Sequence, residues 1–341
     1  MRPQGLLMRS RVLLVSVAAL GVSGVLAQAA SACEVENTTS HAKYSEPTGA
    51  LQSAVEGAVA GNTLKVTGTC EGDTTIGKNL TVEGKSATAT MLKGNGSGSV
   101  VTVTGSATVT IKKLKITGGD ANEGGGLFVE GGAKAIVESV TFADNEAYYG
   151  AGVDNAEGVI TVSKSTFTEN TSGSYGAALM SFGGEVTITK STVTKNRGGC
   201  CGALAEQGAS SYLVTGSKIV SNETQGVAVV GSSVTLEDAK IEKNVALGEH
   251  GAGVNIGEGG NLTLINSSIK SNEALTGGGI QIYETGNIYL YGNSSIEKNK
   301  ATEHGGGIYR ESESADKIVE EPGWTGKITK NTPDQIYSEG P

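Results

Sequence analysis

The sequence contains few arginine, histidine, proline and aromatic residues. Of its 341 residues, three are histidine, five are proline and 4% are aromatic, and the formal net charge is −9. Beyond the first eleven residues the only arginines are Arg197 and Arg310. Because nucleic acids and anionic membranes attract clustered cations, this composition argues against either partner. The 52 glycines follow no G-X-Y period, which excludes collagen.

Long apolar runs are also absent, except near the start of the chain. Residues 1–32 resemble a secretory signal peptide, because three arginines precede an apolar segment and Ala30 to Ala32 supply a small-residue cleavage site. This segment is too short to span a membrane. We expect no transmembrane segment in the mature chain, and a secreted or cell-surface protein. Lipid anchoring at Cys33 is an alternative, although Ala30 stands where lipoproteins usually carry leucine.

The chain has instead a long repeat. An asparagine returns every 22 to 32 residues, three places after a bulky apolar residue, at Asn145, Asn170, Asn196, Asn222, Asn244, Asn272, Asn299 and Asn331. A second column, of small residues ending in one aliphatic, runs in step at Leu127, Val153, Leu179, Leu204, Val229, Val254, Ile280 and Ile308. Two columns at one period predict a solenoid in which each repeat is one coil.

Residues 150–175 show how one coil is expected to be built. GAGV (150–153) predicts a first strand, DNAEG (154–158) a turn, the alternating VITVSKS (159–165) a second strand, and residues 166–167 a brief third. We therefore predict an all-β fold, a right-handed parallel β-helix with three short strands per coil and about ten coils. The asparagines are expected at corners, where they tolerate left-handed backbone and bond from coil to coil.

The two ends of the chain depart from the repeat. Residues 33–63 are predicted to form an N-terminal cap whose apolar residues recur at helical spacing from Leu51 to Val59 and so form a short amphipathic helix. The β-helix is predicted over 64–341. An insertion near 310–326 is expected to cover its far end.

Two segments carry a resemblance to known families. LQSAVEGAVAGNTLKVTGTC (51–70) resembles the opening of pectin-lyase-fold proteins, in which a capping helix leads into the first coil. The glycine-rich and FxxN repeats, FADN and FTEN above all, resemble those of polymorphic outer-membrane proteins and related bacterial right-handed β-helix repeat proteins. The resemblance covers about residues 48–337. It implies the fold strongly and the function weakly, because one fold serves many functions.

The sequence offers no recognisable catalytic group, cofactor site or metal site. Lyases of the pectin-lyase fold resemble each other in carrying clustered calcium-binding aspartates and a basic proton acceptor, whereas the aspartates here occupy different places in the repeat. GEHG (248–251) resembles a G-H-G element of polygalacturonase-like enzymes. No paired aspartates accompany it, and His250 falls in a turn column that explains it without catalysis.

That turn column supplies the candidate ligand-binding edge. Tyr149, Tyr175, His250 and His304 are expected on one line along the coils, where their rings either stack on sugars or cover the glycine corners. A shared metal is excluded because two coils separate His250 from His304.

The four cysteines of an exported chain predict disulfides. We pair Cys33 with Cys70 as a staple for the cap. Cys200 and Cys201 are left as a vicinal disulfide, two free thiols or an intermolecular link.

Two functions follow from these patterns. The first is an exported, non-enzymatic scaffold or adhesin-like module that binds polysaccharide, cell-surface glycan or protein. The alternative is a polysaccharide-active lyase or hydrolase, which carboxylates converging in a groove would favour. The sequence does not indicate an oligomeric state.

Overall fold

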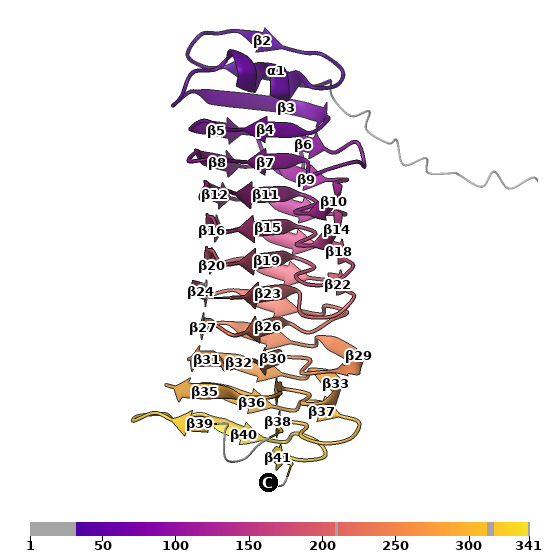
Figure 1. Cartoon of the computed structure of the whole chain (residues 1–341), viewed down its shortest axis with the longest axis vertical. Helices are drawn as coiled ribbons and strands as arrows, with labels where there is room; N and C mark the ends of the chain where they lie inside the picture. Colours follow the sequence, from indigo (N-terminus) through magenta and orange to yellow (C-terminus); the bar gives the residue numbers. More distant parts are fainter. Residues whose placement is uncertain (1–31, 209–210, 312–316, 340–341) are drawn as a thin grey trace, which may run out of the picture. The chain divides into compact units, whose positions relative to one another are not determined.

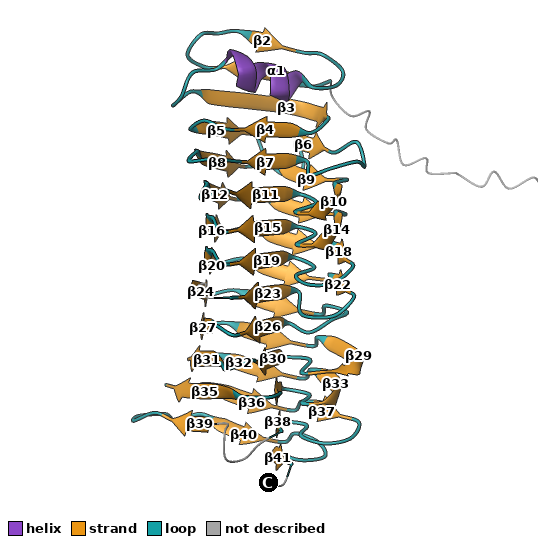
Figure 2. Ribbon diagram, in the orientation of Figure 1, coloured by secondary structure: helices purple, strands orange, loops and turns teal. Residues whose placement is uncertain are grey.

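The glycine and asparagine columns mark corners of successive coils in a right-handed parallel β-helix of about ten coils (Figure 1). The computed structural model describes residues 32–208, 211–311 and 317–339. The predicted signal peptide therefore lies outside the described residues, except for Ala32. The predicted all-β fold is confirmed, and a single short helix stands among the described residues (Figure 2).

Sheet I is an 11-stranded sheet in which every pairing is parallel. Its strands are β4 (Thr74–Ile76), β7 (Val101–Val103), β11 (Leu127–Glu130), β15 (Val153–Ala156), β19 (Leu179–Phe182), β23 (Leu204–Gln207), β26 (Val227–Val230), β30 (Val254–Gly257), β34 (Ile280–Ile282), β38 (Ile308–Arg310) and β41 (Ile336–Ser338).

From β7 onward the strands of sheet I begin at an aliphatic residue, which corrects the predicted first strand. The preceding glycine forms the corner, as at Gly150, whose φ of +59° is left-handed. The segment 154–158 was expected to be a turn, yet Asp154 to Ala156 continue strand β15. The predicted column also misplaced one member: Val227, not Val229, pairs with Leu204.

Sheets II and III are joined through the long strand β3 (Thr63–Glu71) into one 23-stranded network. Sheet II contains β1 (Glu34–Asn37), β2 (Lys43–Tyr44), β5 (Leu80–Glu83), β8 (Thr108–Lys112), β12 (Lys134–Glu138), β16 (Val159–Ser163), β20 (Glu185–Thr189), β24 (Ser211–Thr215), β27 (Ser233–Glu237), β31 (Gly260–Ile265), β35 (Gly286–Tyr291) and β39 (Lys317–Glu320). Sheet III contains β6 (Thr90–Lys93), β9 (Lys115–Thr117), β13 (Thr141–Ala143), β17 (Thr166–Thr168), β21 (Thr192–Thr194), β25 (Lys218–Val220), β28 (Lys240–Glu242), β32 (Ser268–Lys270), β36 (Ser295–Glu297) and β40 (Lys327–Thr329).

Short corner strands add a fourth segment to several coils, between the asparagine and glycine columns. One corner sheet contains β10 (Asp120–Glu123), β14 (Glu146–Tyr149), β18 (Thr171–Ser172) and β22 (Arg197–Gly198). The other contains β29 (Val245–His250), β33 (Glu273–Thr276) and β37 (Lys300–Ala301). These strands lie beside sheet I and therefore form one wall of any surface built on it (Figure 1).

The inward side chains form one continuous apolar core. Alternation along each strand produces it, as in β16, where Ile160 and Val162 are fully buried while Thr161 is exposed. Stacked coils place like residues in contact: the rings of Phe142 and Phe167 lie parallel, with centroids 4.9 Å apart. Burial of such side chains is the main favourable term in folding.

The asparagine column forms a continuous hydrogen-bonded ladder. From Asn145 to Asn299, each side-chain Nδ2 donates to the Oδ1 of the next ladder asparagine at 2.8–3.1 Å. All eight side chains are at most 4% exposed. The left-handed residue was expected to be the asparagine itself, and this is wrong: the residue before it has the positive φ, as at Asp144 and Glu169.

The N-terminal cap combines helix α1 (Ala50–Gly57) with antiparallel strands. Strand β1 pairs antiparallel with both β2 and β3. Helix α1 lies between β2 and β3 (Figure 2), and its Leu51 and Val55 are buried. The helix ends earlier than the apolar spacing indicated, so Val59 is 67% exposed. The predicted Cys33–Cys70 disulfide is confirmed and ties the start of the cap to β3. Cys33 therefore has no free thiol for a lipid.

The far end is less enclosed than the cap. The segment expected to be an insertion supplies β39, which pairs with β35, while residues 312–316 lie outside the described part. The indole Nε1 of Trp324 donates to the carbonyl of Ser294 at 2.9 Å. Ile336, on the inward column of sheet I, is 42% exposed.

Candidate functional site

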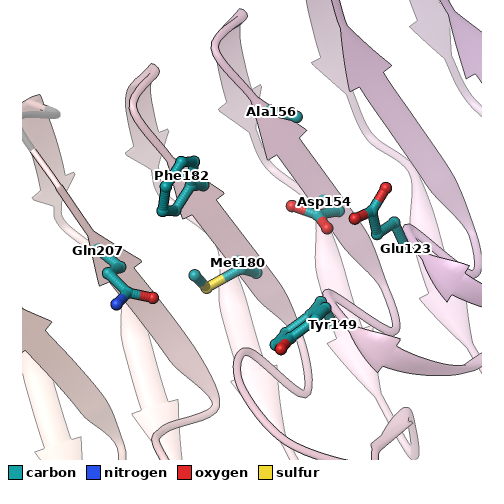
Figure 3. A pocket seen from close by; sticks show the side chains of 7 residues that line it. All are labelled: Glu123, Tyr149, Asp154, Ala156, Met180, Phe182 and Gln207. Carbon is teal, nitrogen blue, oxygen red and sulfur yellow. The ribbon is translucent and has the colours of Figure 1, made fainter.

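The outer face of sheet I contains a hollow that we call the acidic hollow (Figure 3). Its volume is about 290 Å³. Residues from β15, β19 and β23 form its floor, because the positions after each inward aliphatic point outward, and corner strands supply the rest. It is lined by Glu123, Tyr149, Asp154, Ala156, Met180, Phe182 and Gln207.

Asp154 is the most strongly perturbed group of this hollow. It is the outward residue that follows buried Val153 on β15, and only 4% of it is exposed. The pKa of its carboxyl is raised from 3.8 to about 7, chiefly by burial and then by the charge of Glu123, against a smaller lowering by the backbone N–H of Asn155. Near neutral pH this side chain can therefore donate or accept a proton.

Glu123 reaches the hollow from a different element. It is the last residue of β10 and pairs in register with Tyr149 of β14. The Ser99 hydroxyl donates to its backbone carbonyl at 2.9 Å, which fixes the end of the strand. Its side chain is exposed, unlike that of Asp154. The two carboxylates thus share one hollow but differ in environment, the arrangement that separates an acid from a base.

Aromatic rings border the hollow on two sides. Tyr149 stacks edge-on against Tyr148 at 4.7 Å between centroids, and lies 6.2 Å from the ring of Tyr175. Tyr149 and Tyr175 both pack on a small apolar cluster of Met180, Ala205 and Ala228. On the sheet itself the ring of Phe182 is 52% exposed. Exposed rings beside carboxylates suit the apolar faces of sugar rings.

The four side chains of the predicted ligand-binding edge have different surroundings. Tyr149 lines the acidic hollow, Tyr175 packs beside it, and His250 lines a second hollow on the same sheet. His304 lies in the last coils, where its ring stacks on that of Tyr337 with centroids 4.1 Å apart. Its Nδ1 lies 3.7 Å from Oδ2 of Asp334. Strand β29 is irregular between Ala246 and His250, yet His250 pairs with Thr276, so the backbone of the column stays in step while its side chains have different neighbours.

Cys200 and Cys201 are joined by a vicinal disulfide. Cys201 has a φ of +44° at a place where glycine forms the corner of other coils. It packs against the same apolar cluster as Tyr175 and also lines the second hollow. The disulfide therefore belongs to the wall of this face.

Glu123 and Asp154 are not among the site residues expected from the sequence. The aspartates occupy different places in the repeat, whereas Asp154 shares its hollow with a glutamate 31 residues earlier in the chain. Asp154 was also expected to lie in a turn. The sequence did contain one signal for Asp154. If each strand begins at the aliphatic residue of the repeat column, the next residue must point outward.

Two further features bear on partners. Within residues 32–208, 211–311 and 317–339, no group of three or more His, Cys, Asp or Glu residues is arranged to hold a metal ion. No helix in the described part of the chain is both long and apolar enough to cross a membrane.

Comparisons with known proteins agree with the fold. Among solved structures, the chain is similar to the A-module of the mannuronan C-5 epimerase AlgE4 of Azotobacter vinelandii, with 15% identity over 87% of this chain and 96% of that one, and a TM-score of 0.50. A catalytic unit of an α-1,3-glucanase from Streptomyces thermodiastaticus has 13% identity over 84% of this chain and 67% of that one, with a TM-score of 0.37. A capsular polysaccharide depolymerase tailspike of the Acinetobacter baumannii bacteriophage Fri1 has 12% identity over 84% and 61%, with a TM-score of 0.39.

These structural likenesses extend to the fold and no further. No curated protein matches the chain. The family model described as right-handed β-helix region matches residues 98–245, 174–295 and 202–332, which together cover more than half of the sequence. The chain therefore belongs to the right-handed β-helix family.

Proposed function

We propose that the protein is an exported polysaccharide-processing protein that hydrolyses a neutral glycan at the acidic hollow. The observation that carries this proposal is the pairing of buried Asp154 with exposed Glu123 in one hollow. Paired carboxylates in unlike environments are the usual machinery of glycoside hydrolysis. Export is supported by the signal-like residues 1–32 and by the Cys33–Cys70 disulfide.

The two carboxyl groups take complementary roles in this proposal. Asp154, with a pKa of about 7, holds a proton in a large fraction of molecules at neutral pH and donates it to the glycosidic oxygen as the bond to the anomeric carbon breaks. Glu123, which is exposed, takes a proton from the water that attacks this carbon. The reaction consumes one water, whose proton passes to Glu123 and whose hydroxide bonds to the anomeric carbon.

The lining favours a neutral sugar over a uronate. The described residues that line the acidic hollow include two acids and no lysine or arginine. A uronate carboxylate would therefore face like charges without a compensating cation, and elimination would lack a group to stabilise the developing anion. Gln207 and Tyr149 offer hydrogen bonds to hydroxyls, and Phe182 offers an apolar face.

One comparison supports polysaccharide as the substrate class. The fold neighbour with a TM-score of 0.50 is a mannuronan C-5 epimerase by its name, so the same fold acts on a polysaccharide elsewhere. The chemistry proposed here rests on the residues of this chain alone.

The test is hydrolysis of defined polysaccharides by the full protein. Glucans, mannans and xylans of several linkages are incubated with it, and new reducing ends are measured. We expect at least one substrate to be cleaved, and Asp154→Asn and Glu123→Gln to lose at least 100-fold of that activity. Glu146→Gln is the matched control, because Glu146 is an exposed acid on β14 outside the lining.

The outcomes separate the two candidate functions. Failure to cleave any neutral polysaccharide contradicts the hydrolase proposal, as does full activity in both carboxylate variants. Binding without cleavage would instead favour the non-enzymatic scaffold.

A further inference from the structure

A second hollow opens on the outer face of sheet I, and we call it the amide hollow. Its volume is about 270 Å³, close to that of the acidic hollow. It is lined by Cys201, His250, Asn255, Gln281, Tyr283 and Glu311. The neutral amides and the imidazole distinguish its chemistry from that of the acidic hollow.

A short hydrogen-bonded chain fixes the polar groups of the amide hollow. The Thr276 hydroxyl donates its one proton to Oε1 of Gln281 at 2.7 Å, and Nδ1 of His250 lies 2.7 Å from the same hydroxyl oxygen. Because that proton is already committed, Nδ1 of His250 must be the donor. When the imidazole of His250 is neutral, its Nε2 is then the acceptor, and the amide N–H groups of Gln281 remain as donors.

Asn255 adds an unused acceptor to this set. Its Oδ1 is buried and has no hydrogen-bond partner among the described residues. Buried polar atoms are almost always paired, so an unpaired one beside a hollow indicates a partner that arrives from solution. Donors on Gln281 and acceptors on Asn255 and His250 match neighbouring hydroxyl groups, each of which can donate and accept.

The remaining wall combines one acid with apolar groups. Oε2 of Glu311 accepts the backbone N–H of Glu284 at 2.9 Å, so part of this carboxylate is already paired. The ring of Tyr283 lies over Gly257, where a Cβ would overlap the ring atoms, so this glycine makes room for it. Cys201 contributes the vicinal disulfide on the corner side. A sugar presents the same combination, with hydroxyls at its edge and C–H groups on its faces.

The two hollows are aligned along the coils. Asp154 and Asn255 occupy equivalent outward positions, connected by the register pairs through Met180, Ala205 and Ala228. These four strand steps place them about 19 Å apart at the usual spacing of neighbouring strands. The residues between them are small or apolar and mostly buried, so the floor between the hollows carries no charge.

We propose that the amide hollow binds a neutral, hydroxyl-rich sugar unit of the same glycan chain whose bond is cleaved at the acidic hollow. The proposal rests on the proposed function for the identity of the chain, but the binding chemistry is independent of hydrolysis. It assigns to Asn255, Gln281 and His250 the role of selecting long chains over short ones.

The experiment measures binding of a length series, from tri- to octasaccharides of glucose, mannose and xylose, to the full protein by calorimetry. Wild type and Asp154→Asn are expected to bind an octasaccharide at least tenfold more tightly than the matching trisaccharide. Asn255→Leu and Gln281→Leu should remove that length preference. Because the Oδ1 of Asn255 has no partner, Asn255→Leu should fold normally even if Gln281→Leu does not.

Asn261→Leu is the matched control, since Asn261 follows in the same coil but lies on sheet II. A length preference unchanged in Asn255→Leu overturns the proposal, and so does the absence of measurable binding to every oligosaccharide of the series. A preference that depends on Asn255 in a protein without hydrolytic activity would uphold the amide hollow while contradicting the proposed hydrolysis.

Discussion

Gln335 closes the asparagine ladder at Asn331. The Oε1 of Gln335 accepts both the backbone N–H and the side-chain Nδ2–H of Asn331 at 3.1 Å, and its Nε2 donates to the Asn331 carbonyl at 3.0 Å. The glutamine thus supplies the acceptor that the next coil supplies elsewhere, as Asn331 does for Asn299. The ladder therefore ends with its last amide satisfied.

Gln335→Ala should destabilise the last coils. It removes the acceptor of two Asn331 donors, and an unsatisfied buried group costs about 1–3 kcal/mol. Chemical denaturation followed by circular dichroism measures the loss, with Gln335→Glu as the matched variant because it keeps the acceptor and replaces the donor with a carboxylate oxygen. An alanine variant as stable as wild type would show that the terminal bonds carry no stability.

Asn222→Leu should have a larger effect, because the residue lies in the middle of the ladder. Its Oδ1 accepts from both N and Nδ2 of Asn196, and its Nδ2 donates to Asn244 and to the Val193 carbonyl. We expect the free energy of unfolding to fall by about 2–5 kcal/mol, because several buried groups lose their hydrogen-bond partners.

The control for Asn222→Leu is Lys218→Leu, an exposed position in the same coil. It should change the stability by less than about 0.5 kcal/mol. Equal losses of stability in the two variants would mean that the added apolar side chain, and not the broken ladder, causes the change in unfolding free energy.

The two disulfides should differ in their contribution to stability. Cys33 and Cys70 are separated by 37 positions, whereas Cys200 and Cys201 are adjacent and close no loop. Replacing Cys33 and Cys70 together with serine should cost about 2–4 kcal/mol, because a disulfide mainly restricts the unfolded chain. The Cys200–Cys201 double serine variant should cost less. Mass mapping of a non-reduced digest checks the pairing first. Disulfide-linked peptides that join any other pair of cysteines would contradict it.

The fold could be predicted from the sequence because its determinants repeat. From Asn145 onward the coils carry a bulky apolar residue three places before an asparagine, so a single period identifies the corners and the inward face. The two-residue slip at Val227 shows the limit of this reasoning. In a shorter coil, several aliphatic residues are candidates for the inward position that begins the strand. Only the hydrogen-bonded pairing with Leu204 identifies Val227 as that residue.

The acidic hollow could not be predicted because it depends on residues that do not repeat. Asp154 occupies a position filled by Phe128 in the preceding coil and by Met180 in the following one. Glu123 comes from a corner strand whose existence the period does not indicate. The meeting of the two carboxylates is a property of how β10 lies beside β15, which spacing alone cannot supply.

The last prediction concerns Asp154, whose substitution should raise stability above neutral pH and abolish activity. An acid whose pKa rises on folding binds its proton more tightly in the folded state. Its stabilising effect is therefore complete below the ordinary pKa of 3.8 and is lost as the pH rises through about 7. Above pH 7 the buried charge costs about 4 kcal/mol, since the pKa is raised by about 3 units and each unit corresponds to about 1.4 kcal/mol.

Asp154→Asn removes this ionisation and should be more stable than wild type at pH 8 but equally stable at pH 4, while losing hydrolysis at both. Wild-type hydrolysis should also decline above about pH 7, as Asp154 loses the proton it donates. Denaturation curves at the two pH values measure the stability, with Glu146→Gln as a control that should show no such difference. A purely structural Asp154 would lose stability on substitution at every pH, because its interactions would be broken and no penalty relieved. A destabilised Asp154→Asn at pH 8 would therefore contradict the assignment of this carboxyl as a buried acid held ready for proton transfer.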